Sequence, residues 1–130
     1  MKGNTILKLV LALALFALPG CIAAAAGAGA AAGIHLTSQG AEGVASEGVA
    51  AVATRARSVM AAEGITGITV ENEESGTERE YRGMKGEMEV HVKLEARDGG
   101  GTLVRASARE GTVEWNKDYA RTLVARITGG

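Results

Sequence analysis

The chain has 130 residues, with 14 Lys and Arg against 15 Asp and Glu, which gives a formal net charge of −1 at pH 7. Lys2 and Lys8 are two of these basic residues, so 12 basic residues face 15 acidic ones after residue 20, a net charge of −3. This balance, without any basic run, argues against nucleic acid as a partner. Cys21 is the only cysteine, which excludes an intrachain disulfide.

Residues 1–20 have the pattern of a secretory signal. Lys2 and Lys8 form a short basic start, residues 9–18 (LVLALALFAL) are an uninterrupted apolar run, and the small residue Gly20 precedes Cys21. The apolar run is too short to cross a hydrocarbon core, which takes about 20 residues. We therefore expect residues 1–20 to be removed after export.

The end of this segment, Leu18-Pro19-Gly20-Cys21, resembles the lipobox of bacterial lipoproteins, although Pro19 stands where Ala or Ser is more usual. The resemblance implies cleavage between Gly20 and Cys21, diacylation of the Cys21 thiol, and membrane attachment through that lipid. In the sorting pattern of these lipoproteins an Asp after the Cys favours the inner membrane, so Ile22 implies the periplasmic face of the outer membrane. The alternative is an ordinary signal, cut later among the alanines, with an incidental cysteine.

Residues 21–38 are expected to be the lipidated cysteine and a tether, followed by one domain at 39–130. Residues 22–33 (IAAAAGAGAAAG) are nearly all Ala and Gly. Gly29 and Gly33 have the GxxxG spacing that lets apolar helices approach closely, so a short helix near the bilayer is one possibility. The glycine content favours a flexible spacer instead.

A possible strand at 34–38 overlaps the end of the tether, and the first helix of the domain is expected from Ser46, as N-cap, to Glu63. Gly64 then stops the helix. Apolar residues at helical spacing form the buried stripe: Val49, Val52, Ala56, Val59 and Met60. Arg55 and Arg57 lie off this stripe, so we expect both to face water.

After Gly64 the apolar period changes to two, which predicts strands. Ile68 and Val70 mark one strand, a polar turn follows at 72–76, and residues 78–84 return with Tyr81 inward. Residues 87–97 show the clearest alternation, with Glu89, His91 and Lys93 on the polar face. A turn at 98–101 (DGGG) leads to a strand at 102–109, and a helix capped by Asn116 is expected to run to Ile127.

This order of elements predicts an α+β fold, a small antiparallel meander sheet with two helices packed on one face. The whole chain also resembles a family of uncharacterised bacterial lipoproteins that carry a domain of unknown function. The resemblance rests on the lipobox, the Ala/Gly stretch, the helix ending in Gly64-Ile65-Thr66, and the closing segment 111–127 (GTVEWNKDYARTLVARI). It implies localisation and fold, and no established activity.

The polar residues do not form a recognisable catalytic set. Glu89 and His91, two apart on one strand, are weak candidates for metal ligands, and a zinc site would need a third ligand. His91 is better explained as a solvated strand residue. A crowd of glutamates around one hairpin is explained by solvation and by the charge that discourages pairing at a sheet edge: Glu71, Glu73, Glu74, Glu78 and Glu80.

Trp115 precedes the last helix, where it could pack beneath the helix start or contact a partner or the headgroup layer. The first of these is favoured. We expect no enzyme and no cofactor, because no convergent set of titratable groups is visible. The sequence favours a lipid-anchored envelope lipoprotein with a structural or interaction domain, partnered by the membrane and by an envelope protein. The alternative is a lipid-anchored enzyme or a ligand- or metal-binding protein that uses the polar face of the sheet.

Overall fold

A computed structural model describes residues 33–129 of the chain. The expected signal segment, Cys21 and the tether up to residue 32 lie outside the described residues. The compact unit begins at Gly33. His35 and Leu36 form a short strand within the possible strand expected at 34–38, so they belong to the folded unit although they fall in the expected tether 21–38.

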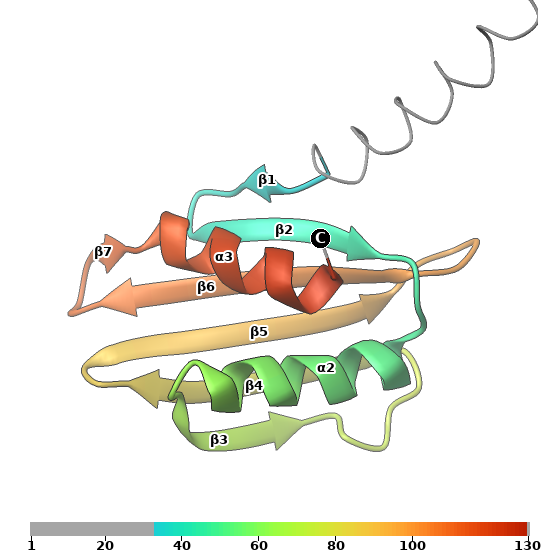
Figure 1. The fold of residues 1–130 in the computed structure, drawn as a ribbon, viewed down its shortest axis with the longest axis horizontal. Coiled ribbons are helices and arrows are strands. Elements are labelled where there is room, and N and C mark those ends of the chain that lie inside the picture. The colour runs from blue at the N-terminus through green and yellow to red at the C-terminus, as the bar shows by residue number, and fades with distance from the viewer. Residues whose placement is uncertain (1–32, 130) are drawn as a thin grey trace, which may run out of the picture. The chain divides into compact units, whose positions relative to one another are not determined.

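The described part of the chain contains two helices and seven strands (Figure 1). In chain order they are β1 (His35–Leu36), β2 (Gly40–Ala45), α2 (Val49–Ala62), β3 (Thr66–Glu71), β4 (Glu78–Lys85), β5 (Met88–Ala96), β6 (Thr102–Glu110), β7 (Glu114–Trp115) and α3 (Lys117–Thr128).

The strands form one antiparallel sheet in the order β1-β2-β6-β5-β4-β3, and β7 also pairs with β6. Strands β3 to β6 are a meander, in which each strand pairs with the next along the chain. β2 breaks this order, because it pairs with β6 although α2 and three strands separate the two in sequence. The expected α+β fold with a meander sheet is confirmed.

Both helices cover the same face of the sheet (Figure 1). α3 packs on β2 and β6, α2 packs on β4 and β5, and the helices contact each other. The core between these layers is built from small and aliphatic side chains, with Tyr81 of β4 as its largest fully buried member. The buried stripe expected on α2 is confirmed at Val49, Val52, Ala56, Val59 and Met60.

Strand β2 lies at residues 40–45, where the sequence pattern predicts no element. Its sequence, GAEGVA, is poor in the β-branched and aromatic residues that favour strands. The structure explains the small residues, because a Cβ at Gly43 would lie 2.8 Å from a methyl carbon of Val124 on α3. Helix α3 can therefore approach β2 closely only because Gly43 has no side chain.

The start of α2 also differs from the expectation. The N-cap is Gly48, without a side-chain capping bond, and Ser46 lies two residues before it. The Thr102 hydroxyl donates to the Glu47 carbonyl over 2.8 Å, which fixes the segment between β2 and α2 in a non-helical conformation. The helix therefore begins three residues later than the expected cap, at Val49.

Arg55 was expected to face water, and this was wrong. Its guanidinium donates to the Ile127 carbonyl of α3 over 3.0 Å and pairs with Glu47. Ile127 lies in the last turn of α3, where carbonyl groups lack partners within the helix. Arg55 thus links α2 to the end of α3, while Arg57 is exposed as expected.

The remaining elements follow the sequence pattern. Residues on β5 alternate between buried and more exposed from Met88 to Glu95, and three glycines with positive φ form the turn before β6. The Asn116 side chain accepts the Tyr119 amide over 3.0 Å, so it caps α3 as expected. Gly64, with φ 77°, follows the end of α2.

Candidate functional site

The candidate site is the face of the sheet opposite the helices, called here the open face. Paired residues on neighbouring strands share a face, so the register defines its members. From β2 to β6 they are Glu42 and Val44; Thr69 and Glu71; Glu78, Glu80, Arg82 and Met84; Glu89, His91, Lys93 and Glu95; Leu103, Arg105, Ser107 and Arg109. The polar residues expected on β5 are therefore on this face.

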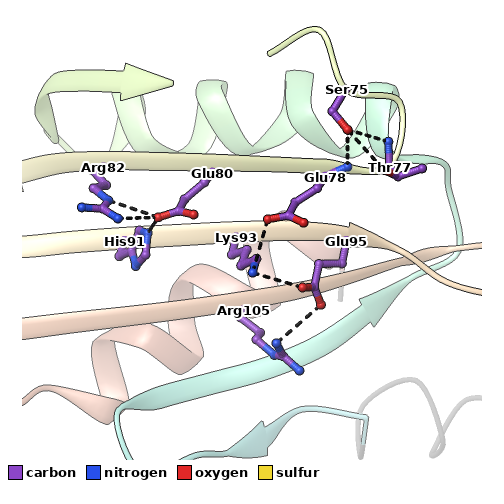
Figure 2. A network of polar contacts seen from close by, with 9 residues as sticks. All are labelled: Ser75, Thr77, Glu78, Glu80, Arg82, His91, Lys93, Glu95 and Arg105. Atoms are coloured by element: carbon purple, nitrogen blue, oxygen red, sulfur yellow. Dashed lines mark hydrogen bonds and ion pairs between the residues drawn. The ribbon is translucent and has the colours of Figure 1, made fainter. Parts of the chain in front are cut away.

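His91 lies near the middle of the open face, beside the carboxylate of Glu80, a contact that the sequence pattern does not predict. Its Nε2 atom contacts Oε1 of Glu80 on β4, and the same oxygen accepts from Arg82 Nε at 3.1 Å and Nη2 at 2.7 Å (Figure 2). The Glu80 side chain is only 13% exposed. The hydrogen bond from Arg82 holds the pKa of Glu80 below its ordinary value despite desolvation, and His91 lowers it further. Glu80 is therefore an ionised acceptor held between two donors.

A second group of charges runs across four strands. Lys93 Nζ lies 3.3 Å from Glu78 and 3.2 Å from Glu95, and Arg105 lies 3.5 Å from Glu95 and 3.1 Å from Glu42. Figure 2 shows how Glu78, Lys93, Glu95 and Arg105 follow one another over β4, β5 and β6. Hydrogen bonds to Glu95 and Glu78 raise the pKa of Lys93. The cations of this group are already occupied by carboxylates of the same chain.

The two weak metal candidates have different partners. Glu89 pairs with Arg109 over 3.1 Å, whereas His91 contacts Glu80. Within residues 33–129, no three His, Cys, Asp or Glu side chains gather into a group that could hold a metal ion. The contact between His91 and Glu80 could not be read from the sequence, because it depends on the pairing register of β4 with β5.

The glutamates of the β3–β4 hairpin are spread over several contacts rather than gathered in one place. Glu78 and Glu80 contact cations on the open face, and Glu73 lies 3.7 Å from Arg57 of α2. Glu74 is exposed. In the described structure this hairpin is a set of dispersed surface ion pairs.

Two shallow hollows adjoin His91 on the side of the open face toward β1. They have volumes of about 140 and 120 Å³ and share Gln39, His91 and Ser107 in their lining. Ser107 lies opposite His91 in the β5–β6 pairing, so a serine, a histidine and Glu80 stand on neighbouring strands. In the described residues, however, no hydrogen bond joins Ser107 to His91, and the amides of both strands pair in the sheet. The arrangement therefore lacks both an activated nucleophile and free amides for an oxyanion.

Trp115 lies at the edge of the sheet and does not pack into the core. The apolar core, with the side chains packed against it, is built without this indole in the described structure. Its ring lies 5.6 Å from the guanidinium carbon of Arg109, a cation–π contact. The expectation that Trp115 packs beneath the start of α3 is therefore wrong: strand β7 pairs it with Arg109 on the open side.

No protein-family model matches the chain, and neither a curated protein nor a solved structure matches it. Neither helix among residues 33–129 is long and apolar enough to cross a membrane.

Proposed function

We propose that the chain is a lipid-anchored lipoprotein of the cell envelope whose folded domain serves interaction rather than catalysis. The observation that supports the anchor is the segment Leu18-Pro19-Gly20-Cys21 after an apolar run. It resembles a lipobox, and the sole cysteine of the chain occupies its last position. Two acyl chains are enough for stable attachment to a membrane.

The open face supports the second half of the proposal. Its cations are engaged with carboxylates of the same face, from Glu80 and Arg82 to Glu95 and Arg105. A catalytic site needs titratable groups that are free to meet a substrate and convergent on one point. A charged face whose cations are already paired is better suited to a protein partner with a complementary charge pattern. We propose such a partner in the envelope, with the domain on the periplasmic face of the outer membrane.

The anchor is tested by metabolic labelling with palmitate. The native chain is expected to incorporate label and to lose residues 1–20, and Cys21→Ser is expected to lose both label and processing. Ile22→Asp is the matched variant: it keeps the label and moves the protein to the inner-membrane fraction. Label that persists in Cys21→Ser contradicts the anchor.

The interaction role is tested by photo-crosslinking in intact cells. A photoreactive residue at Val44, which is 45% exposed on the open face, is expected to capture one envelope protein. The same residue at Ser58, exposed on α2, is the control and captures none. Equal capture from both positions, or from neither, argues against the open face as the binding surface.

The alternative function, a ligand- or metal-binding lipoprotein, is favoured by the hollows beside His91. It predicts that Zn²⁺ shifts the NMR signals of the His91 imidazole and saturates at one ion per chain. Our proposal predicts no saturable shift, because Glu80 already occupies Nε2 and Glu89 is held by Arg109.

A further inference from the structure

Apolar side chains are exposed at one end of the domain, around β7. Val113, in the turn between β6 and β7, is 81% exposed, and Leu36 of β1 is 48% exposed. Trp115 is partly exposed and lines a hollow of about 410 Å³ together with Leu36. We refer to Leu36, Val113 and Trp115 as the apolar end.

The apolar end is fixed in place rather than loosely attached. Trp115 pairs with Arg109 in the ladder between β6 and β7, and the Asn116 amide donates to the Ala108 carbonyl over 2.8 Å. The guanidinium of Arg109 stacks on the indole and is itself held by Glu89 over 3.1 Å. Backbone contacts of Trp115 and Asn116, and the contact of Arg109 with one face of the ring, therefore hold the indole at the edge of the sheet.

The chain enters the folded unit through β1, which carries Leu36 of the apolar end. Gly33 is the first described residue, and Leu36 follows it by three positions within β1. Residues 22–32, between Cys21 and Gly33, can extend over at most about 40 Å, at about 3.5 Å each. That distance is close to the full thickness of a bilayer with its headgroups, so a domain anchored at Cys21 remains within reach of the membrane surface.

We propose that the apolar end inserts into the headgroup layer of the membrane that carries the lipid anchor. This inference rests on the proposed anchoring through Cys21. Indole rings prefer the boundary between water and hydrocarbon, because their body is apolar and their N–H is polar. Two exposed aliphatic residues, Leu36 in the same hollow and Val113 two positions before the indole in the chain, add apolar area that water would otherwise contact.

The charges around the apolar end identify the kind of lipid surface. The hollow that holds Leu36 and Trp115 is also lined by acidic and basic residues: Glu110, Glu114, Asp118 and Lys117. Three carboxylates outnumber the Lys117 ammonium group, and the Arg109 guanidinium on the indole is paired with Glu89. This balance offers no attraction for anionic headgroups. The partner surface is therefore zwitterionic, of the phosphatidylethanolamine or phosphatidylcholine type.

The experiment uses Trp115 as its own probe, since it is the only tryptophan of the chain. The lipidated full-length protein is reconstituted into vesicles of phosphatidylcholine and phosphatidylethanolamine, with and without brominated acyl chains. The emission is expected to shift to shorter wavelength and to be quenched several-fold by the brominated lipid. A blue shift without quenching means that protein, such as the tether or a second copy, covers the indole, and it overturns the inference.

Two matched variants separate insertion from simple proximity. Val113→Asp places a charge in the apolar end and is expected to abolish most of the quenching. Val44→Asp changes a second exposed valine, 45% exposed on the open face, and is expected to leave the quenching unchanged. Equal effects of the two variants overturn the inference, as does stronger quenching when anionic lipid replaces part of the zwitterionic lipid.

The failure of this inference is distinguishable from failure of the anchor. Palmitate labelling of the same preparation reports on Cys21 alone. Labelled protein whose Trp115 stays unquenched contradicts the insertion of the apolar end and leaves the anchor standing. Absence of label contradicts the anchor itself.

Discussion

The two faces of the sheet come from the same strands and the same alternation of residues, yet their side chains make different interactions. On the face that the helices cover, side chains such as Val92 and Leu94 are fully buried. On the open face, Lys93 and Glu95 of the same strand remain about one-third exposed and pair with neighbouring charges. Burial of apolar area stabilises far more than exposed ion pairs do. The covered face therefore determines whether the domain folds, and the open face is free to change in evolution at small cost in stability.

The largest difference in stability between the two faces is expected for two leucines on neighbouring strands. Leu94→Ala removes a fully buried side chain and is expected to lower the free energy of unfolding by about 2–5 kcal/mol. Leu103→Ala, on the open face of β6, is the control and is expected to cost much less. Urea denaturation monitored by circular dichroism measures both values, and similar losses would contradict the comparison.

The second test concerns the pairing of β2 with β6, at the position where the two backbones leave the least room for a side chain. A Cβ at Gly40 would lie 2.0 Å from the Ala106 carbonyl oxygen, so Gly40→Ala must displace β2 from β6. Such overpacking typically costs about 1–3 kcal/mol. Gly76→Ala is the control, because a Cβ there has no neighbour within 4 Å. Thermal unfolding compares the two variants, and an unchanged melting temperature for Gly40→Ala would contradict the described pairing.

A charged cluster on the covered side gives the third test. Glu63, at the end of α2, accepts from Lys85 of β4 over 3.2 Å, from Tyr119 of α3 over 3.3 Å, and from Arg126 of α3. Its side chain is 16% exposed. Burial alone would raise the pKa of Glu63, but the hydrogen bonds from Lys85 and Arg126 outweigh it and lower the pKa.

Glu63→Gln is therefore expected to cost about 1–2 kcal/mol near neutral pH, in line with hydrogen bonds to a charged group. A depressed pKa in the folded state stabilises above the ordinary value of 4.5 and loses this contribution as the pH falls below it. The difference between native protein and variant should shrink when denaturation is repeated from pH 6 down to pH 3. Glu74→Gln, at an exposed position, is the control and should show no such trend.

The smallest effect is expected on the open face. Arg105→Ala breaks contacts with Glu42 and Glu95, but the Arg105 side chain is 49% exposed. We expect a loss of less than about 1 kcal/mol, as for other exposed ion pairs. Arg55→Ala is the counterpart on the covered side, and it should cost more because the Ile127 carbonyl loses its donor. Reversal of this order in denaturation experiments would contradict the division between the faces.

Periodicity predicted the strands with alternating side chains and the helix with a capping residue. The pattern on β5 and the cap at Asn116 depend on residues close in sequence, so both were predictable. Strand β2 was not, because Ala41, Gly43 and Ala45 are small to accommodate α3 rather than to satisfy a strand preference. The contact of His91 with Glu80 was not predictable either, since it depends on a register that only the folded sheet defines.

The pairing of β2 with β6 has a consequence for the order in which the chain folds. Gly40 pairs with Ser107, so 67 positions of chain must be present before the ladder can close. The meander from β3 to β6 involves only neighbouring strands and can form earlier, since short loops close at lower entropic cost. β2, the first six-residue strand of the described chain, is therefore expected to join the sheet after the meander, and β1, which pairs with β2, is expected to follow it.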